Sequence, residues 1–327
     1  MTRQPAYRKK TSPPRLGAIS LSLLLCFSLA LMLRRADVAA DCMREGLTLC
    51  ARAVVPSLFP FMVLSELLVT TGAGEWLTAP FAPLLKKLLG ISRAGCCAVV
   101  LGLLCGFPVG ARCAITAYKK GLMELDECER VIACSSIPSS AFLISTVGTT
   151  LWKDARFGVV LYFFAIISAL FSGFLLYVLQ KRNKKRTQKS LPFSSTKILF
   201  EAGMLPSAVR NATASTLLIC AYVVFFSTLA GAVETVLCRF AANEATHAII
   251  SSFLELSSGV SSAAELANRK FAKILTGAAI GWSGLSIHCQ MLSLCEGYGV
   301  SARPYLVAKV LQAVVCATVS ALIWHFL

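Results

Sequence analysis

Apolar stretches of about twenty residues recur along the whole chain and constrain its fold more than any other feature. They occupy residues 17–33, 53–74, 156–179, 213–236 and 304–327. A helix needs roughly twenty apolar residues to cross the hydrocarbon core of a bilayer, which is about 30 Å thick. Charged residues make up only 15% of the sequence, whereas soluble domains average about 25%. The sequence therefore predicts an all-α polytopic membrane protein embedded in the lipid bilayer.

Four further apolar stretches are interrupted by glycine, proline or serine. The interruptions read GFPVG (106–110), SSIPSS (135–140), SSGVSS (257–262) and GWSGLS (281–286). Proline removes a helical N–H and glycine permits a sharp reversal, so each interruption predicts a broken helix. The order full helix, broken, broken, full helix occurs on both sides of a basic linker. We interpret the chain as an internal duplication. The predicted segments are a basic N-terminus (1–16), a first helix with an amphipathic connector (17–52), a first repeat (53–179), a basic linker with an amphipathic segment (180–210) and a second repeat (211–327).

The basic residues indicate how the chain crosses the membrane. The net charge is +16, but Lys and Arg stand in short loops beside apolar spans, which is typical of topology signals and argues against nucleic-acid binding. The densest clusters, in the N-terminus and at 181–190, are predicted to be cytoplasmic. Five apolar elements lie between them, an odd number, and the stretch 96–118 has lysines at both ends. We therefore expect 96–118 to be a re-entrant hairpin and the two repeats to be inverted, with 247–268 as the second hairpin. Inverted repeats with broken helices are the construction of secondary transporters.

The sequence favours no enzymatic chemistry. No acid, base and nucleophile fall at one depth, no nucleotide-phosphate loop is present, and the 14 cysteines lack C-x-x-C spacing, so no catalytic residue, metal or cofactor is expected. The first apolar run could also be a cleaved signal sequence, because DVAAD follows it. A retained helix is the prediction, and this alternative stays open.

Arg112 lies within the first broken stretch. A charged residue at membrane depth costs at least about 2.5 to 3.5 kcal/mol and needs a cavity or a partner. A guanidinium matches a carboxylate or phosphate bidentately, so one hypothesis is an anion clamp. The alternative is an ion pair with an acid such as Glu66 or Glu255, or an interfacial position.

Hydroxyls, amides and helix N-termini at the four interruptions suit a site that binds and releases a small polar molecule. Serines in such segments can instead bond to their own turn, which is the alternative. The predicted substrate-binding residues are Gly106, Pro108, Gly110, Arg112, Ser135, Ser136, Ser139, Ser257, Ser258, Ser261, Ser283, Ser286, His288 and Gln290.

Two acids lie inside apolar runs, Glu66 in FMVLSELLVTTG and Glu255 in SSFLELSSG. Desolvation moves the pKa of a buried carboxyl towards neutrality, so either acid could couple transport to protons, and sodium is the other candidate ion. Alternatively, these acids pair with Arg112 or His288.

Four stretches resemble the sporulation integral membrane protein family of endospore-forming bacteria. They are PSLFPFMVLSELL (56–68), GFPVGAR (106–112), SSAFLISTVG (139–148) and GLSIHCQM (284–291), and the resemblance covers roughly residues 45–327. The two nucleoside-recognition gate domains of that family are similar to parts of concentrative nucleoside transporters. The family usually has an Asn-Pro break where this chain has Ser136, Ile137 and Pro138.

The resemblance implies a transporter of a small anionic solute, dipicolinic acid, during sporulation. It also implies a multi-pass protein of the cell membrane or the outer forespore membrane, and the charge pattern described above places the N-terminus in the cytoplasm. The gate-domain likeness would instead imply a nucleoside transporter. A different class, a non-transporting assembly factor for the spore envelope, is the remaining alternative, and a homo-oligomer is left open.

Overall fold

The computed structural model describes residues 16–183, 200–237 and 243–323. Within these ranges the chain forms helices and no strand, which confirms the predicted all-α membrane class. The predictions made for the basic N-terminus and for most of the linker lie outside the described residues.

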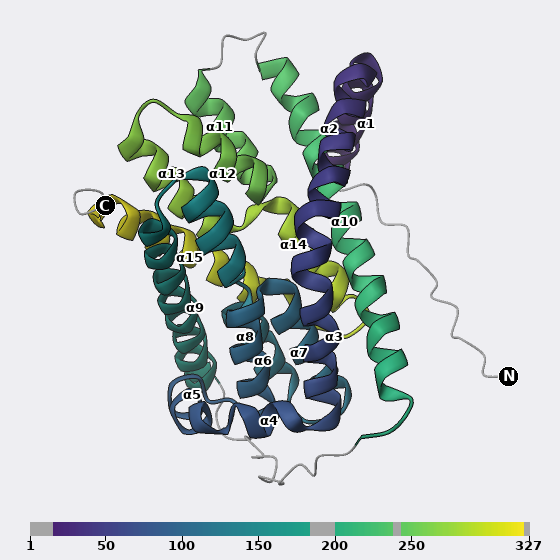
Figure 1. Ribbon diagram of the computed structural model, residues 1–327, viewed down its shortest axis with the longest axis vertical. Helices are drawn as coiled ribbons and strands as arrows, with labels where there is room; N and C mark the ends of the chain where they lie inside the picture. The colour runs from purple at the N-terminus through teal and green to yellow at the C-terminus, as the bar shows by residue number, and fades with distance from the viewer. Residues whose placement is uncertain (1–15, 184–199, 238–242, 324–327) are drawn as a thin grey trace, which may run out of the picture.

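The first half begins with a helical hairpin and continues into a bundle (Figure 1). Its elements are α1 (Leu16–Arg34), α2 (Ala36–Leu49), a π-turn (Cys50–Val54), α3 (Val55–Thr71), α4 (Ala73–Leu77), a 3₁₀ turn (Ala79–Phe81), α5 (Ala82–Leu89), α6 (Arg93–Cys105), α7 (Phe107–Lys119), α8 (Leu125–Ser135), a π-helix (Phe142–Leu151) and α9 (Ala155–Asn183).

The second half repeats part of this order. Its elements are α10 (Met204–Leu237), α11 (Glu244–Leu254), α12 (Leu256–Glu265), α13 (Arg269–Trp282), α14 (Gly284–Cys295) and α15 (Ala302–Ile323). In each half a long helix, α3 or α10, is followed by a pair of short helices, an interrupted segment and a second long helix, α9 or α15. In the first half, α4, the 3₁₀ turn and α5 stand between the long helix and the short pair, and the internal duplication stays a prediction.

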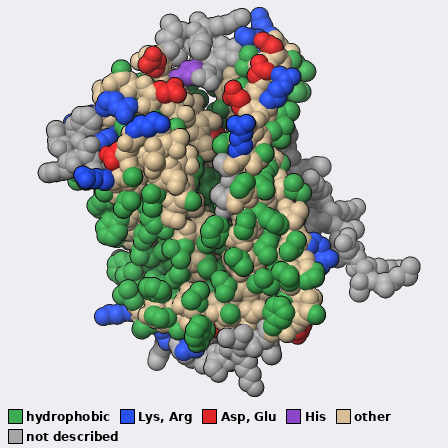
Figure 2. All heavy atoms as spheres, in the orientation of Figure 1, with side chains coloured by type: hydrophobic (Ala, Val, Ile, Leu, Met, Phe, Trp, Pro, Cys, Tyr) green, Lys and Arg blue, Asp and Glu red, His purple; other side chains and the backbone are tan. Residues whose placement is uncertain are grey.

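The long helices carry the apolar surface. Among the described residues, three segments are long and apolar enough to cross a membrane, namely Ala155–Lys181, Met204–Val233 and Ala302–Ile323. A bent pair, Ala79–Leu89 with Arg93–Cys105, forms a further candidate with an angle of 99°. Large apolar side chains such as Phe163, Phe225 and Val314 are exposed on these helices. Figure 2 shows such side chains covering the broad middle of the molecule, with charged groups gathered towards its two ends. This is the surface expected of a protein surrounded by lipid.

Contacts between residues far apart in the sequence are found at the two ends of the molecule. At the end formed by α4 and α5, Lys119 lies over the ring of Tyr298 at 4.2 Å and Glu129 accepts a hydrogen bond from the backbone N–H of Ser301. At the opposite end, Arg269 lies 4.3 Å from the ring centroid of Trp152. We call these the α4 end and the α11 end, after helices visible at the bottom and top of Figure 1.

Two helices differ from the predicted bounds. The stretch 53–74 forms α3 only from Val55 to Thr71, because Gly72 adopts a left-handed conformation with φ of 79° that ends the helix. The helix expected at 213–236 begins earlier, at Met204, so the end of the predicted linker is already part of α10. Pro206 stands in its first turn, where no N–H donor is needed.

Candidate functional site

The first interruption is a tight helical hairpin. The chain reverses at Gly106, whose φ of 98° is accessible to glycine, and α6 and α7 pack against each other on either side. A methyl group added at Gly102 would lie 2.7 Å from the Cα of Gly110, so the two arms touch backbone to backbone. Pro108 occupies the first turn of α7, where its missing N–H has no cost. Each arm has 13 residues, about 20 Å, which is shorter than the thickness of a bilayer.

This hairpin is seated on the broken helix of its own half. The Cβ position of Gly106 is 3.0 Å from the backbone nitrogen of Ser139. Ser140 donates a hydrogen bond to the carbonyl of Leu104 at 3.2 Å. The predicted tip and the predicted SSIPSS break therefore meet.

The second hairpin turns at a different residue from the predicted one. The sequence placed its tip at 257–262, whereas α11 ends at Leu254 and the extended residue is Glu255, so 257–262 form the first turns of α12. The physical reason is capping, because the Glu255 carboxylate accepts a hydrogen bond from the Ser258 N–H at 2.7 Å and stabilises the start of α12. Ser257, Ser258 and Ser261 are half-buried on this helix.

The second hairpin also rests on a break in its own half. Ser283 and Gly284 both have left-handed backbone conformations between α13 and α14. The Cβ position of Gly284 is 2.9 Å from the backbone nitrogen of Leu256 and 3.2 Å from the Cα of Glu255. Each hairpin tip thus packs against the interruption of the same half.

Side chains of α14 and α15 link the two halves. The hydroxyl of Ser136, at the first break, lies 4.0 Å from the sulfur of Met291 on α14. The carbonyl of Ser136 accepts a hydrogen bond from the Nζ of Lys309 at 2.9 Å. His288 on α14 shares a hydrogen bond of 2.8 Å with the hydroxyl of Tyr305 on α15. We call Ser135, Ser136, His288, Gln290, Tyr305, Lys309 and Gln312 the break cluster.

Several polar atoms of the break cluster have no hydrogen-bond partner among the residues that the structure describes. They are the Ser135 hydroxyl, the Nε2 of His288 and the Oε1 of Gln290. These side chains are almost fully buried. An unsatisfied buried polar group costs about 1–3 kcal/mol, so such atoms are retained where a ligand or water can bind them. Gln290 does donate to Ser286, at 3.2 Å.

Arg112 is held in a separate polar group. Its Nε lies 3.1 Å from the Oε2 of Glu66, and its Nη1 donates to the Ser215 hydroxyl. The other carboxylate oxygen of Glu66 accepts from Asn211 at 3.2 Å. Helices α3, α7 and α10 each contribute to this group, which we call the Glu66 group. The ion pair with Glu66 is the alternative to the anion clamp that the sequence left open.

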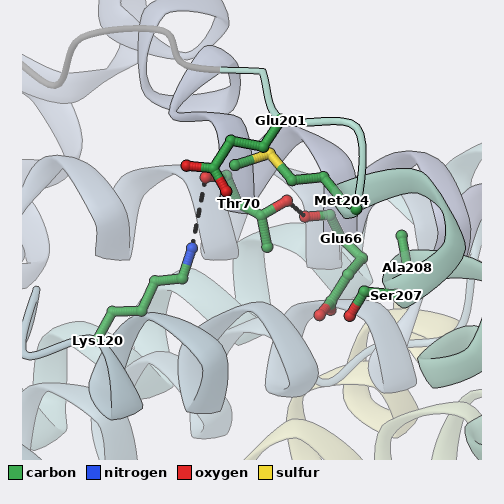
Figure 3. Close-up of a pocket in the computed structure, with 8 residues that line it drawn as sticks. Glu66, Thr70, Lys120, Glu201, Met204, Ser207 and Ala208 are labelled. Atoms are coloured by element: carbon green, nitrogen blue, oxygen red, sulfur yellow. Dashed lines mark hydrogen bonds between the residues drawn. The ribbon is translucent and has the colours of Figure 1, made fainter.

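A cavity of about 290 Å³ leads from the α4 end to Glu66 (Figure 3). Its walls come from α3, from Lys120 after α7 and from residues 201–208, and in Figure 3 Glu66 and Ser207 lie at one side with Glu201 at another. Lys120 donates to the carbonyl of Thr70 at 3.4 Å. The two predicted acids thus differ, because Glu66 borders a cavity whereas Glu255 is buried as a helix cap.

The predicted site residues therefore fall into two separate groups. Gly106 packs against Ser139, Gly284 packs against Glu255, and the first break contacts α14 and α15. Arg112 belongs instead to the Glu66 group. Sequence reasoning missed residues in both clusters: Asn211, Ser215, Tyr305, Lys309 and Gln312. A charged lysine inside the final apolar helix was the available signal for Lys309, since a charge at that depth marks a functional position by default.

Comparison with known proteins supports the same fold. No family model matches the sequence. The chain is 21% identical to the sporulation integral membrane protein YlbJ of Bacillus subtilis (strain 168), over 95% of this chain and 83% of that protein. Its fold is similar to a variant of CNTnw, a concentrative nucleoside transporter, in an outward-facing state, with a TM-score of 0.57 at 15% identity over 94% of this chain and 85% of that chain. The sporulation resemblance is thereby supported over most of the chain, and the assignment of two gate domains stays a prediction.

Proposed function

We propose that this protein is a secondary transporter that moves a small polar solute across a membrane. The observation that carries the proposal is the paired arrangement of the breaks, in which each hairpin tip packs against an interrupted helix of its own half. Buried polar atoms beside the breaks lack partners within the described part of the chain. Non-helical backbone at membrane depth is tolerated where it is buried in protein or lines a cavity, and transporters bind solutes at such breaks. The fold shared with CNTnw supports this class.

The solute we propose is anionic, with dipicolinic acid as the first candidate. Helices α7 and α14 begin at breaks without a side-chain cap, and the N-terminus of a helix favours negative charge. The relative YlbJ is a sporulation membrane protein, which suits a spore solute. Arg112 can serve as the predicted clamp only if it exchanges Glu66 for the solute.

The two halves are proposed to be inverted in the membrane, with the hairpins entering from opposite faces. The α4 end carries the lysines around the first hairpin and is proposed to face the cytoplasm. Proton coupling is proposed at Glu66 in preference to Glu255, because a cavity connects Glu66 to the end surface.

Two other functions have specific support. A nucleoside is favoured as the solute by the likeness to CNTnw. An assembly role without transport is favoured by the burial of Ser135, Ser283 and Ser286, each 0% exposed, since a scaffold would fill the space between the breaks with side chains.

Uptake into proteoliposomes tests these functions. Purified protein is reconstituted with an imposed pH gradient, and labelled dipicolinate and labelled nucleoside are offered in parallel, with empty vesicles as the control. We expect saturable dipicolinate uptake that is lost in Gln290→Ala and Arg112→Ala and kept in Thr318→Ala, an exposed position on α15. Uptake of the nucleoside without uptake of dipicolinate would show that the solute is a nucleoside. No uptake of either by folded protein would favour the assembly role.

A further inference from the structure

Lys309 is a fully buried lysine on α15. Its exposed fraction is 0%, and its Nζ donates to the Ser136 carbonyl at 2.9 Å and to the Oε1 of Gln312 at 3.0 Å. None of the described carboxylates forms an ion pair with it. A buried charge is costly unless it is both paired and hydrogen-bonded, and here the two acceptors of the Nζ are neutral oxygens.

These bonds satisfy two of the carbonyls at the broken end of α8. The helix ends at Ser135, before Pro138, which has no N–H with which to continue it. Gln312 donates to the carbonyl of Ala133 at 3.1 Å and Lys309 to that of Ser136. The carbonyls at a helix C-terminus carry the negative end of the helix dipole, so a cation at this point is stabilised.

The C-terminal carbonyls of two other half-helices, α6 and α11, are capped by neutral donors. At the end of α6 the carbonyl of Leu103 accepts from the hydroxyl of Tyr162 at 2.9 Å. At the end of α11 the carbonyl of Phe253 accepts from the indole of Trp282 at 3.2 Å. Neutral donors are therefore sufficient to cap a half-helix in this protein, and capping alone does not require the ammonium at α8.

Unwound carbonyls together with the C-terminus of a half-helix are the groups with which secondary transporters hold a coupling cation. We propose that the Lys309 ammonium is a tethered substitute for such a cation at the first break, so that the break is held without a bound alkali ion and transport does not require Na⁺. The independence of transport from Na⁺ rests on the proposed function, whereas the role of Lys309 at the first break does not depend on it.

Thermal melting of the purified protein tests the tethered cation without any transport. The wild type should melt at the same temperature in NaCl, in methylammonium chloride and in choline chloride. Lys309→Ala should melt lower in choline, and Na⁺ or methylammonium at ten times its dissociation constant should raise the melting temperature by about 2 °C. Lys309→Met, whose side chain fills the space without charge, should show no such rescue.

Either of two results would overturn the proposal. One is stabilisation of the wild type by Na⁺ over choline, which would indicate a separate alkali site. The other is a folded Lys309→Ala whose melting temperature is the same in all salts. If Lys309→Ala does not fold, Lys309→Arg, which keeps the charge, must retain the wild-type insensitivity to salt.

Uptake separates this proposal from the proposed function. Dipicolinate or nucleoside uptake by the wild type should change less than twofold when Na⁺ is replaced by choline. Uptake that requires Na⁺ would refute the tethered cation and keep the transporter. The expected melting pattern without uptake of either solute would keep the tethered cation and refute the transporter.

Discussion

Replacement of Glu66 by methionine should destabilise the protein strongly. The change removes the carboxylate 3.1 Å from Arg112, in a pair whose side chains are only 7% and 15% exposed. Breaking a buried ion pair from one side costs about 3–5 kcal/mol, because the remaining charge is stranded. Arg112 keeps the Ser215 hydroxyl, so we expect the lower limit, about 3 kcal/mol, which corresponds to roughly 4 °C in melting temperature for a chain of this length.

A double-mutant cycle gives the sharper measurement. Arg112→Met should cost a similar amount, because it leaves Glu66 with Asn211 alone. The free energy of unfolding lost in the double variant should be smaller than the sum of the two single losses by at least about 2 kcal/mol, since neither charge is then left without its partner.

The matched control is the pair between Arg44 and Asp41 on α2. Its atoms are closer, at 2.7 Å, but the side chains are 76% and 69% exposed, and such surface pairs contribute about 0–1 kcal/mol. Arg44→Met should therefore leave the melting curve almost unchanged. The assay is thermal unfolding of purified protein in detergent, followed by loss of the monodisperse elution peak. Additive losses in the double variant, or a Glu66→Met protein as stable as the wild type, would refute the burial argument.

Three further changes test other contacts. Gly102→Ala places a methyl group 2.6 Å from its nearest neighbour, whereas Gly203→Ala meets nothing within 4 Å, so only the first should lower the melting temperature by several degrees; equal melting curves would contradict the close packing of the hairpin. Asn268→Ala removes the side-chain cap of α13 and should cost about 1 kcal/mol in denaturant unfolding, and an unchanged midpoint would show that the cap contributes nothing. Glu255→Gln keeps the shape of the cap on α12 and should fold, and because proton coupling is proposed at Glu66, the pH profile of uptake should be unchanged; a flattened profile would assign coupling to Glu255.

The sequence predicted those features that depend on local chemistry. Gly106 and Pro138 interrupt helices through their local backbone chemistry, whatever the tertiary structure, so these breaks were correctly placed. The turn at Glu255 was misplaced by a few residues because the serines and Gly259 gave the stronger local signal. A carboxylate can end one helix and cap the next, and this is visible only once the Ser258 N–H is seen beside it.

Features that depend on distant partners were not predictable. Lys309 acts on Ser136, which is 173 residues away in sequence, and no periodicity in α15 indicates that contact. The pairing of Arg112 with Glu66 was one of several open alternatives, since apolar runs contain two acids and spacing does not choose between them. Asn211 and Ser215 lie on a helix of the other half, so their place in the Glu66 group follows from tertiary packing alone.

The two faces of α7 differ in a way that limits how this molecule can deform. Towards α8 the contact is backbone against side chain, with the Cβ position of Gly110 only 2.6 Å from the Cβ of Ser135, and such a surface cannot slide without collision. Towards α3 and α10 the contact includes charged and hydroxyl groups, whose bonds can be exchanged for others of the same kind. A rearrangement that preserves this close contact carries the first hairpin and α8 together as one block, and on the side of α3 and α10 the boundary of that block runs through Arg112.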